Sequence, residues 1–162
     1  MKQRDRPVRP LKSGLPGFTM TEVLIVMAIA GVLAALATPS FNEMVKSQRM
    51  KSMATDLNQS LLRTRSEAIK RNKSVTLSPT TVGAWQNGWR IADPDNGGTF
   101  LEIHDAFSGL TATGPTSVTY QTSGRIQGTA APAFNISAAD SSSQRCVSVD
   151  LSGRPYTKAS AC

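Results

Sequence analysis

The stretch GFTMTEVLIVMAIAGVLAALATPSF, residues 17–41, decides the fold expected for this chain of 162 residues. Fifteen residues from Val23 to Ala37 carry no charge, and Glu22 is the one ionisable side chain in the stretch. A helix rises about 1.5 Å per residue, so about 20 residues cover the roughly 30 Å hydrocarbon core of a bilayer. The segment from Phe18 to Ala37 is therefore long and apolar enough to span a membrane.

A basic segment precedes the apolar stretch. Residues 1–17 contain five basic residues and one acid. A basic flank stays on the cytoplasmic side of a membrane, so the residues after the span should emerge on the far side. An ordinary signal-peptide cleavage site after the apolar run is poorly matched, because Pro39 interrupts the small-residue pattern at 36–40. The abrupt change between Gly17 and Phe18 is the better site for processing.

The opening of the stretch follows a specific order of residues: Gly17, Phe18, Thr19 and Glu22, then an apolar run that Pro39 closes. This order resembles the class III signal of type IV pilins and type II secretion pseudopilins. The resemblance implies a cytoplasmic leader at 1–17, removed by a prepilin peptidase between Gly17 and Phe18, and methylation of the new amino terminus of Phe18. It also implies that residues 18–38 cross the inner membrane once and later form the core of a filament of major and minor pilins.

Glu22 is the unusual residue of this span. A carboxylate in hydrocarbon costs about 2.5 to 3.5 kcal/mol on insertion scales, and such residues usually have a partner. In pilins the matching glutamate is thought to meet the amino group of a neighbouring subunit, so the resemblance implies that Glu22 pairs with Phe18 of another chain and sets the register of assembly. The alternative is a local effect, in which Glu22 complements the positive end of the helix dipole or snorkels to the interface.

Length and charge limit the remaining chain to one small domain. After the leader and the span, about 125 residues remain, which is enough for a single core. The whole chain carries a formal charge of +7, of which the leader contributes a net +4, so the rest carries +3. Most of the basic excess is therefore a targeting signal, and composition gives little support for a nucleic-acid partner.

Residues 39–73 predict an amphipathic helix that ends near Asn72. Its apolar residues recur with helical spacing and predict a buried stripe: Met50, Met53, Ala54, Leu57, Leu61 and Ala68. On the opposite face the charges alternate in sign, and Arg63 with Glu67 and Glu67 with Arg71 have the i, i+4 spacing of ion pairs. This alternation favours a solvated face over a nucleic-acid stripe.

From residue 74 to residue 162 the sequence predicts an antiparallel β domain, so the expected fold class is α+β, a long N-terminal helix packed on a C-terminal sheet. Short β-type runs alternate with turn residues, at 74–77, 89–92, 99–104, 117–121, 134–137 and 145–151. Two of these runs lead into the same tripeptide, Ser-Gly-Arg, at 123–125 and 152–154. Glycine can adopt positive φ there and turn the chain.

Two cysteines, Cys146 and Cys162, lie on the predicted far side of the membrane. In an oxidising compartment they should pair and pin the C-terminal tail to the last strand. A chain-entropy estimate for such a loop is about 3 kcal/mol of stabilisation. A reactive thiol is the alternative, and the lack of a nearby histidine speaks against it.

Motifs for catalysis are absent from the sequence. His104 is the single histidine, and no nucleophile elbow, zinc-protease motif, Cys-x-x-Cys or phosphate loop is present. The acidic run at 93–98 fails an EF-hand pattern, because Gly97 and His104 occupy positions that require ligands. We therefore expect a protein that is not an enzyme, with no cofactor and no metal, and a hairpin turn at 93–98.

Within the pilins, the chain resembles the GspH/FimT group, which includes the FimT and FimU minor pilins and the H-type minor pseudopilin. The resemblance rests on LLRTRSEAIKRN at 61–72, a Trp-x-x-Gly-Trp run at 85–89, and the segment from Cys146 to Arg154 with a cysteine near the end. It implies three candidate functions: a structural minor pilin of the tip or priming complex of a type IV pilus, a DNA-capturing pilin for natural transformation, or a minor pseudopilin of a type II secretion system. The sequence favours the first.

DNA uptake by FimT-type members involves a C-terminal Gly-Arg-x-Arg motif. This chain has Gly153-Arg154-Pro155-Tyr156, so the second arginine is missing. A small phosphate-contacting and stacking patch remains conceivable, from Arg154, Tyr156, Lys158, Arg125 and Arg145. The alternative is a turn with solvated charges.

Overall fold

The computed structural model describes residues 17–162, with the side chains of residues 37–39 left out. The predicted leader at 1–17 thus lies almost wholly outside the described residues. One long helix, α1 (Met20–Arg71), is followed by eight strands. The chain divides into two compact units between Pro39 and Ser40. The sequence-based prediction placed the boundary between the span and the amphipathic helix after residue 38, and each unit is described by itself below.

Both ends of α1 carry capping interactions. At the start, the Thr19 hydroxyl accepts a hydrogen bond from the backbone N–H of Glu22 at 3.2 Å, which satisfies one of the free amides of the first turn. At the end, Asn72 adopts a left-handed φ of 51°. The Lys73 amide then bonds to the Ala68 carbonyl at 3.2 Å and the Asn72 amide to the Ile69 carbonyl at 3.3 Å. This is a Schellman cap, and it confirms the helix end predicted near Asn72.

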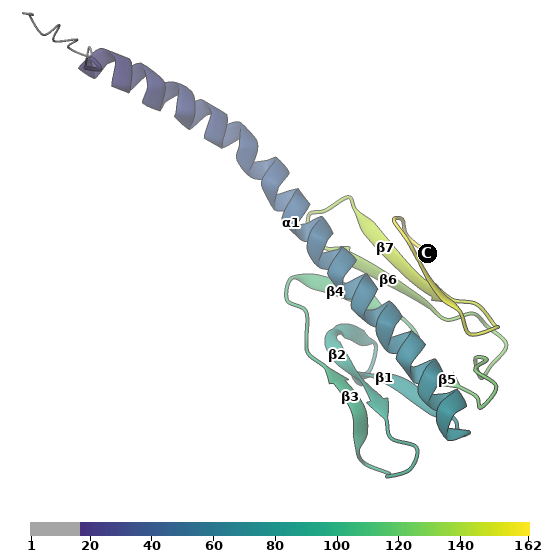
Figure 1. Ribbon diagram of the computed structural model, residues 1–162. Helices are drawn as coiled ribbons and strands as arrows, with labels where there is room; N and C mark the ends of the chain where they lie inside the picture. Colours follow the sequence, from purple (N-terminus) through teal and green to yellow (C-terminus); the bar gives the residue numbers. More distant parts are fainter. Residues whose placement is uncertain (1–16) are drawn as a thin grey trace, which may run out of the picture. The chain divides into compact units, whose positions relative to one another are not determined.

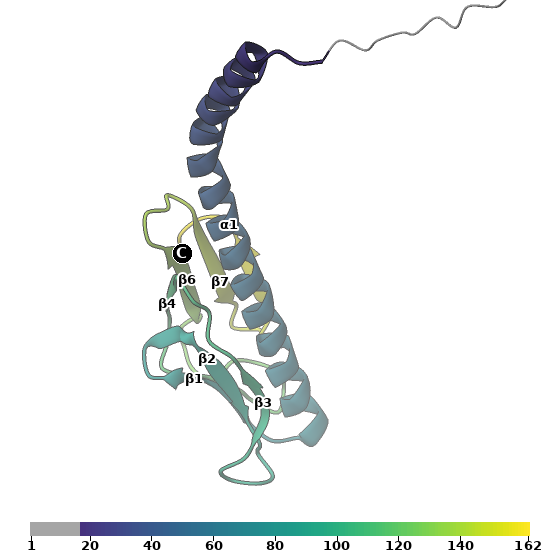
Figure 2. The same ribbon diagram turned by 90° about the vertical axis from the view of Figure 1, so that its left-hand side faces the viewer.

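Two four-stranded antiparallel sheets follow the helix (Figure 1). The first has the order β3-β2-β1-β5, with β1 at Val75–Thr81, β2 at Ala84–Ala92, β3 at Phe100–His104 and β5 at Val118–Tyr120. The second has the order β4-β6-β7-β8, with β4 at Leu110–Thr113, β6 at Ala133–Ala138, β7 at Gln144–Val149 and β8 at Pro155–Lys158. The two views together place both sheets along the part of α1 that follows Ser40 (Figure 2).

The core forms where the buried stripe of α1 meets both sheets. All six residues of the predicted stripe are buried, with exposed fractions of 3% or less. They pack with Trp85 and Trp89 of β2 and with Phe134 of β6, all fully buried. The Trp85 and Phe134 rings meet edge to face, with centroids 4.7 Å apart. The α+β architecture predicted from the sequence, a long helix packed on antiparallel sheets, is therefore confirmed.

Six of the eight strands coincide with predicted runs, and two were missed. β4 is a four-residue strand of alternating buried and exposed residues, too short to stand out between Gly109 and Gly114. β8 begins with Pro155 and is mostly exposed. It lies at a sheet edge, where proline is tolerated, and it lacks the apolar alternation by which strands are recognised.

The disulfide predicted from the sequence is present. Cys146 and Cys162 are bonded, and their Cα atoms lie 5.0 Å apart. Because Cys146 belongs to β7 and pairs in register with Lys158 of β8, the bond fixes the tail that follows β8 against β7.

Candidate functional sites

The N-terminal unit presents an apolar helix that none of the described residues covers. Among the described residues, one helix is long and apolar enough to cross a membrane, and none of its most apolar 18-residue window is buried. The side chains of Phe18, Met20 and Leu24 are exposed by 82%, 83% and 65%. A helix that is apolar on all sides requires lipid or protein around it. This helix and the motif at its start therefore indicate membrane anchoring.

Phe18 and Glu22 lie on the same side of this helix. Together with Val23, Val26 and Met27 they line a shallow groove of about 210 Å³. The Glu22 carboxylate makes no ion pair with any cation among residues 17–162, while its amide is held by the Thr19 cap. Glu22 thus occupies the first turn, as the local alternative requires, and its carboxylate forms no ion pair with the described residues.

The two Ser-Gly-Arg segments form turns with the same hydrogen-bond pattern. After β5, the Gln121 amide bonds to the Arg125 carbonyl at 2.8 Å and the Gly124 amide to the Gln121 carbonyl at 2.8 Å. Between β7 and β8, the Asp150 amide bonds to the Arg154 carbonyl at 3.1 Å and the Gly153 amide to the Asp150 carbonyl at 2.9 Å. Gly124 and Gly153 have φ values of 74° and 83°, which explains why both turns require glycine.

These two turns also touch each other. A Cβ atom on Gly153 would lie 2.0 Å from the Gly124 carbonyl oxygen, and one on Gly124 would lie 2.7 Å from the Ile69 side chain of α1. Both glycines are buried, whereas Arg125 and Arg154, which follow them, are exposed. The two turns therefore contact each other, and the first also contacts α1. The arginine that follows each glycine is exposed beside this contact.

Hydrogen bonds set the electrostatics of the second turn. The Ser152 hydroxyl donates to the Asp150 carboxylate at 2.6 Å, and the Arg154 amide donates to the same oxygen at 2.9 Å. These bonds hold the pKa of Asp150 below its usual range, the Ser152 bond most of all. Burial raises the pKa of the nearby Tyr120 hydroxyl. The Asp150 carboxylate therefore stabilises its own turn.

The five residues considered for DNA do not form one patch. Tyr156 is 42% exposed on β8, and the Lys158 ammonium lies 5.4 Å from the centre of its ring. Arg145 pairs in register with the buried Ile136, so it projects from the core-facing side of the sheet, while Tyr156 pairs with Ser148 on the other side. Arg154 and Arg125 belong to the touching turns, and Arg145 stands apart.

A polar cluster beside β3 was not predicted. The buried Ser60 hydroxyl accepts a hydrogen bond from the Trp89 indole at 2.9 Å and donates one to Glu102 at 2.8 Å. Glu102 also pairs with Arg63 at 2.7 Å, so the predicted pairing of Arg63 with Glu67 was wrong, because a carboxylate on β3 offers Arg63 a closer partner. The signal that could have revealed the cluster is Ser60 itself, a polar residue at helical spacing within the apolar stripe.

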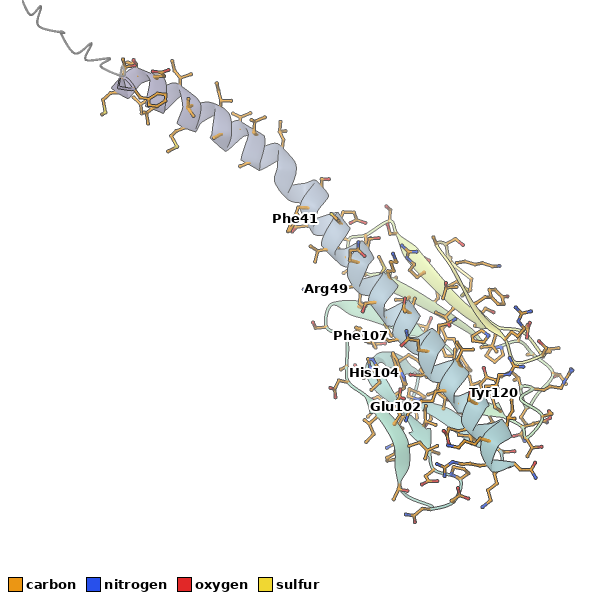
Figure 3. All side chains as sticks on the ribbon, in the orientation of Figure 1. Phe41, Arg49, Glu102, His104, Phe107 and Tyr120 are labelled. Atoms are coloured by element: carbon orange, nitrogen blue, oxygen red, sulfur yellow. A yellow bond between two sulfur atoms is a disulfide. The ribbon has the colours of Figure 1, made fainter. Side chains whose placement is uncertain are left out.

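His104 belongs to the same region and lies on a strand, as predicted. Its ring stacks on Trp89, with centroids 4.2 Å apart, and on Phe107, with centroids 5.2 Å apart. Its Nε2 atom lies 3.7 Å from the Asp56 carboxylate. Figure 3 shows Glu102, His104 and Phe107 lying along the same flank of α1. These contacts assign His104 to the packing between β3 and the helix.

The acidic run at 93–98 is the predicted hairpin turn between β2 and β3. Arg71 contacts Asp93 at 3.2 Å and Asp95 at 2.5 Å, and Lys73 contacts Asp95 at 2.7 Å. Arg71 also pairs with Glu67 at 2.7 Å, as predicted. Residues 17–162 contain no group of three or more side chains arranged to hold a metal ion. The acids of this turn are therefore neutralised by the end of α1.

Comparisons with known proteins agree with this architecture. Residues 53–153 match the family described as type II transport protein GspH, and residues 16–38 match the prokaryotic N-terminal methylation motif. The chain is 43% identical over 87 residues to the pilin-like protein PilA1 of Thermus thermophilus, covering 48% of this chain and 53% of PilA1. It therefore spans about half the length of that relative.

Solved structures share the fold. The type IV minor pilin FimU of Pseudomonas aeruginosa superposes with a TM-score of 0.60 at 24% identity, covering 67% of this chain and 91% of FimU. The minor pseudopilin EpsH of Vibrio cholerae superposes with a TM-score of 0.55 at 16% identity, covering 68% of this chain and 97% of EpsH. With the family match over residues 53–153 and the methylation motif before it, the chain belongs to the GspH family of type IV pilins and pseudopilins.

Proposed function

We propose that this chain is a minor pilin, a structural component of the tip or priming complex that promotes assembly of a type IV pilus. The observation that carries the proposal is the uncovered apolar helix behind the methylation motif. After cleavage between Gly17 and Phe18, this helix is held in the inner membrane with the domain at 74–162 in the periplasm, and it later packs among the helices of other pilins. The descriptions of PilA1 as pilin-like and FimU as a minor pilin support this reading.

Processing tests the first step. Mass spectrometry of the mature protein from its host should give an amino terminus at Phe18 that carries a methyl group. Gly17→Ala should leave the leader attached, whereas Gly31→Ala, a glycine of the same segment with open space around it, should be processed normally. A mature protein that starts at another residue would contradict the proposal.

Assembly tests the second step. Glu22→Ala should insert into the membrane at the normal level and fail to enter filaments, because the free amine of Phe18 on a neighbouring subunit loses its partner. Thr21→Ala removes an adjacent polar group and serves as the matched control. If Glu22→Ala enters filaments as well as Thr21→Ala does, Glu22 serves only its own helix.

A pseudopilin of a type II secretion system is the alternative of the same class, and EpsH supports it. Deletion of the gene separates the two. Loss of surface pili with normal secretion of exported enzymes supports the pilus, and the reverse pattern supports secretion.

One observation favours a second function, DNA capture: the turns that carry Arg125 and Arg154 touch through their backbones. Two exposed arginines on touching turns suit contacts with phosphate, and the exposed Tyr156, two residues after Arg154, suits stacking on bases. Full-length protein in detergent should then bind DNA in a salt-sensitive manner, and Arg154→Ala or Arg125→Ala should weaken binding. Arg90→Ala, which removes an arginine that lies over Phe100, is the control. Equal binding by all three variants would remove the case for DNA.

A further inference from the structure

A cavity of about 530 Å³ lies where β7, the β6–β7 loop and the C-terminal tail meet α1. Its size is within the range of small-molecule sites in proteins, roughly 300–1,000 Å³. Figure 1 shows the C-terminal end beside β7. The lining consists of Ser47, Ser142, Ser143, Gln144, Arg145 and the tail at 159–161.

Hydrogen bonds to α1 fix the loop that forms one wall. The Lys46 ammonium donates to the Ala139 carbonyl at 2.7 Å, and the Ser141 hydroxyl donates to the Glu43 carboxylate. The Ser143 amide in turn donates to the Ser141 hydroxyl oxygen at 3.1 Å. Two side chains of α1 and two serines thus hold this wall in place.

The disulfide fixes the opposite wall. Cys146 follows Arg145 on β7, and its bond to Cys162 holds the tail that lines the cavity. Arg145 lies between these walls, on the core-facing side of β7. The cavity is therefore built from four separate parts of the chain, which are held together by the hydrogen bonds of the loop and by the disulfide.

Several hydrogen-bond donors that line the cavity have no partner among the described residues. Among residues 17–162, Arg145 makes no ion pair and its side chain no hydrogen bond, and the hydroxyls of Ser47, Ser142 and Ser143 are likewise unused. The Gln144 carbonyl oxygen accepts a bond from Asn135, and none of the residues that line the cavity is an acid. Arg63 and Arg71, by contrast, are both paired with carboxylates.

We propose that this cavity binds a phosphate group. A phosphate presents only acceptor oxygens in a tetrahedral arrangement, so it requires several donors from different directions. A guanidinium fork supplies charge and two parallel donors, and the three serine hydroxyls supply the remainder. The site is separate from the exposed arginines of the touching turns, so it goes beyond the function proposed above and does not depend on DNA capture.

The source of the phosphate is either a free phosphate ion or the headgroup of a phospholipid. Calorimetric titration of the full chain in detergent, at constant ionic strength, uses inorganic phosphate in one arm and glycerol 3-phosphate in the other. Saturable binding is expected in both arms. Tighter binding of glycerol 3-phosphate assigns the site to headgroups, and equal or tighter binding of inorganic phosphate assigns it to the free ion.

Variants decide whether the cavity is responsible. Arg145→Ala should weaken phosphate binding by about tenfold or more, the loss expected for one hydrogen bond between charged groups. Arg125→Ala removes the same charge from an exposed turn and should bind as the unmodified protein does. The double variant S142A/S143A changes loop hydroxyls and should weaken binding several-fold without a change in melting temperature. Absence of saturable binding, or equal affinity in Arg145→Ala and Arg125→Ala, would overturn the proposal.

Discussion

Gly153, in the turn between β7 and β8, lies directly against the carbonyl oxygen of Gly124, in the turn that follows β5. A Cβ atom at Gly153 would be 2.0 Å from that oxygen. The obstacle is backbone, which cannot move aside as a flexible side chain can. One turn follows β5 of the first sheet and the other joins β7 and β8 of the second sheet, so the contact joins the two halves of the β domain.

Gly153→Ala should therefore destabilise the domain strongly. Gly83 is a matched control, because it has a φ of 78° and open space around it. Gly83→Ala should cost about 1–2 kcal/mol for the left-handed backbone alone, and Gly153→Ala should cost a further 1–3 kcal/mol, roughly the range for overpacking. Chemical unfolding of the full chain measures both values. Equal costs at the two positions would show that the turns separate readily.

Ser60→Ala should destabilise the contact between α1 and β3. It removes the acceptor of the Trp89 indole and a donor to Glu102, and a buried polar group left without a partner costs about 1–3 kcal/mol. Trp89 fluorescence should change with it. Ser66→Ala is the control, because Ser66 is exposed and donates to the Leu62 carbonyl of its own helix. A surface change of that kind should stay within about 0.5 kcal/mol.

Acid should loosen the β2–β3 hairpin from the end of α1. The hydrogen bond from Arg71 holds the pKa of Glu67 below its usual 4.5, and Lys73, then Arg71, hold the pKa of Asp95 below its usual 3.8. The unfolded chain takes up these protons first, so the stability that the pairs provide is present above about pH 4.5 and is lost as pH falls through the lower folded values.

Melting temperatures measured from about pH 6 to about pH 2 check this expectation. The decrease should be shallower in Glu67→Gln and in Asp95→Asn, because each variant removes one of the linked protons. The same slope in all the variants would mean that other carboxylates dominate the acid response.

Breaking the disulfide should cost stability even though Cys162 is exposed. Cys162→Ser should lower the free energy of unfolding by about 3 kcal/mol on the chain-entropy estimate, for a bond that joins residues 16 positions apart. Reduction of the unmodified protein should give the same value, and adding reductant to Cys162→Ser should change nothing further. A much smaller loss would mean that β7 and β8 hold the tail without the bond.

The parts of the fold that depend on local periodicity were predictable from the sequence. The buried stripe of α1, its end at Asn72 and the hairpin between β2 and β3 follow from helical spacing, charge and turn residues close together in the chain. β8 was not predictable, because an edge strand that starts with proline buries little. Its sequence therefore lacks the alternation of apolar and polar residues that predicts a strand.

Contacts between distant segments were beyond such reasoning. Two acids are candidate partners for Arg63, Glu67 and Glu102. Glu67 is near in the sequence and has the i, i+4 spacing of a helical ion pair. Only the folded sheet brings Glu102 within 2.7 Å. The two Ser-Gly-Arg turns are recognisable as turns, but nothing in their residues indicates that they meet. The residues of these turns could thus be singled out one by one from the sequence, and the contact between the turns could not.

The first part of the helix that begins at Met20 is apolar on all faces, and Val23, Leu24, Ile25 and Val26 are all exposed. Hydrophobic burial alone does not fix the rotation of such a helix about its axis, because every face buries a comparable apolar area. The lone acid at Glu22 breaks that symmetry, so under the proposed function it sets both the rotation and the height of a neighbouring subunit.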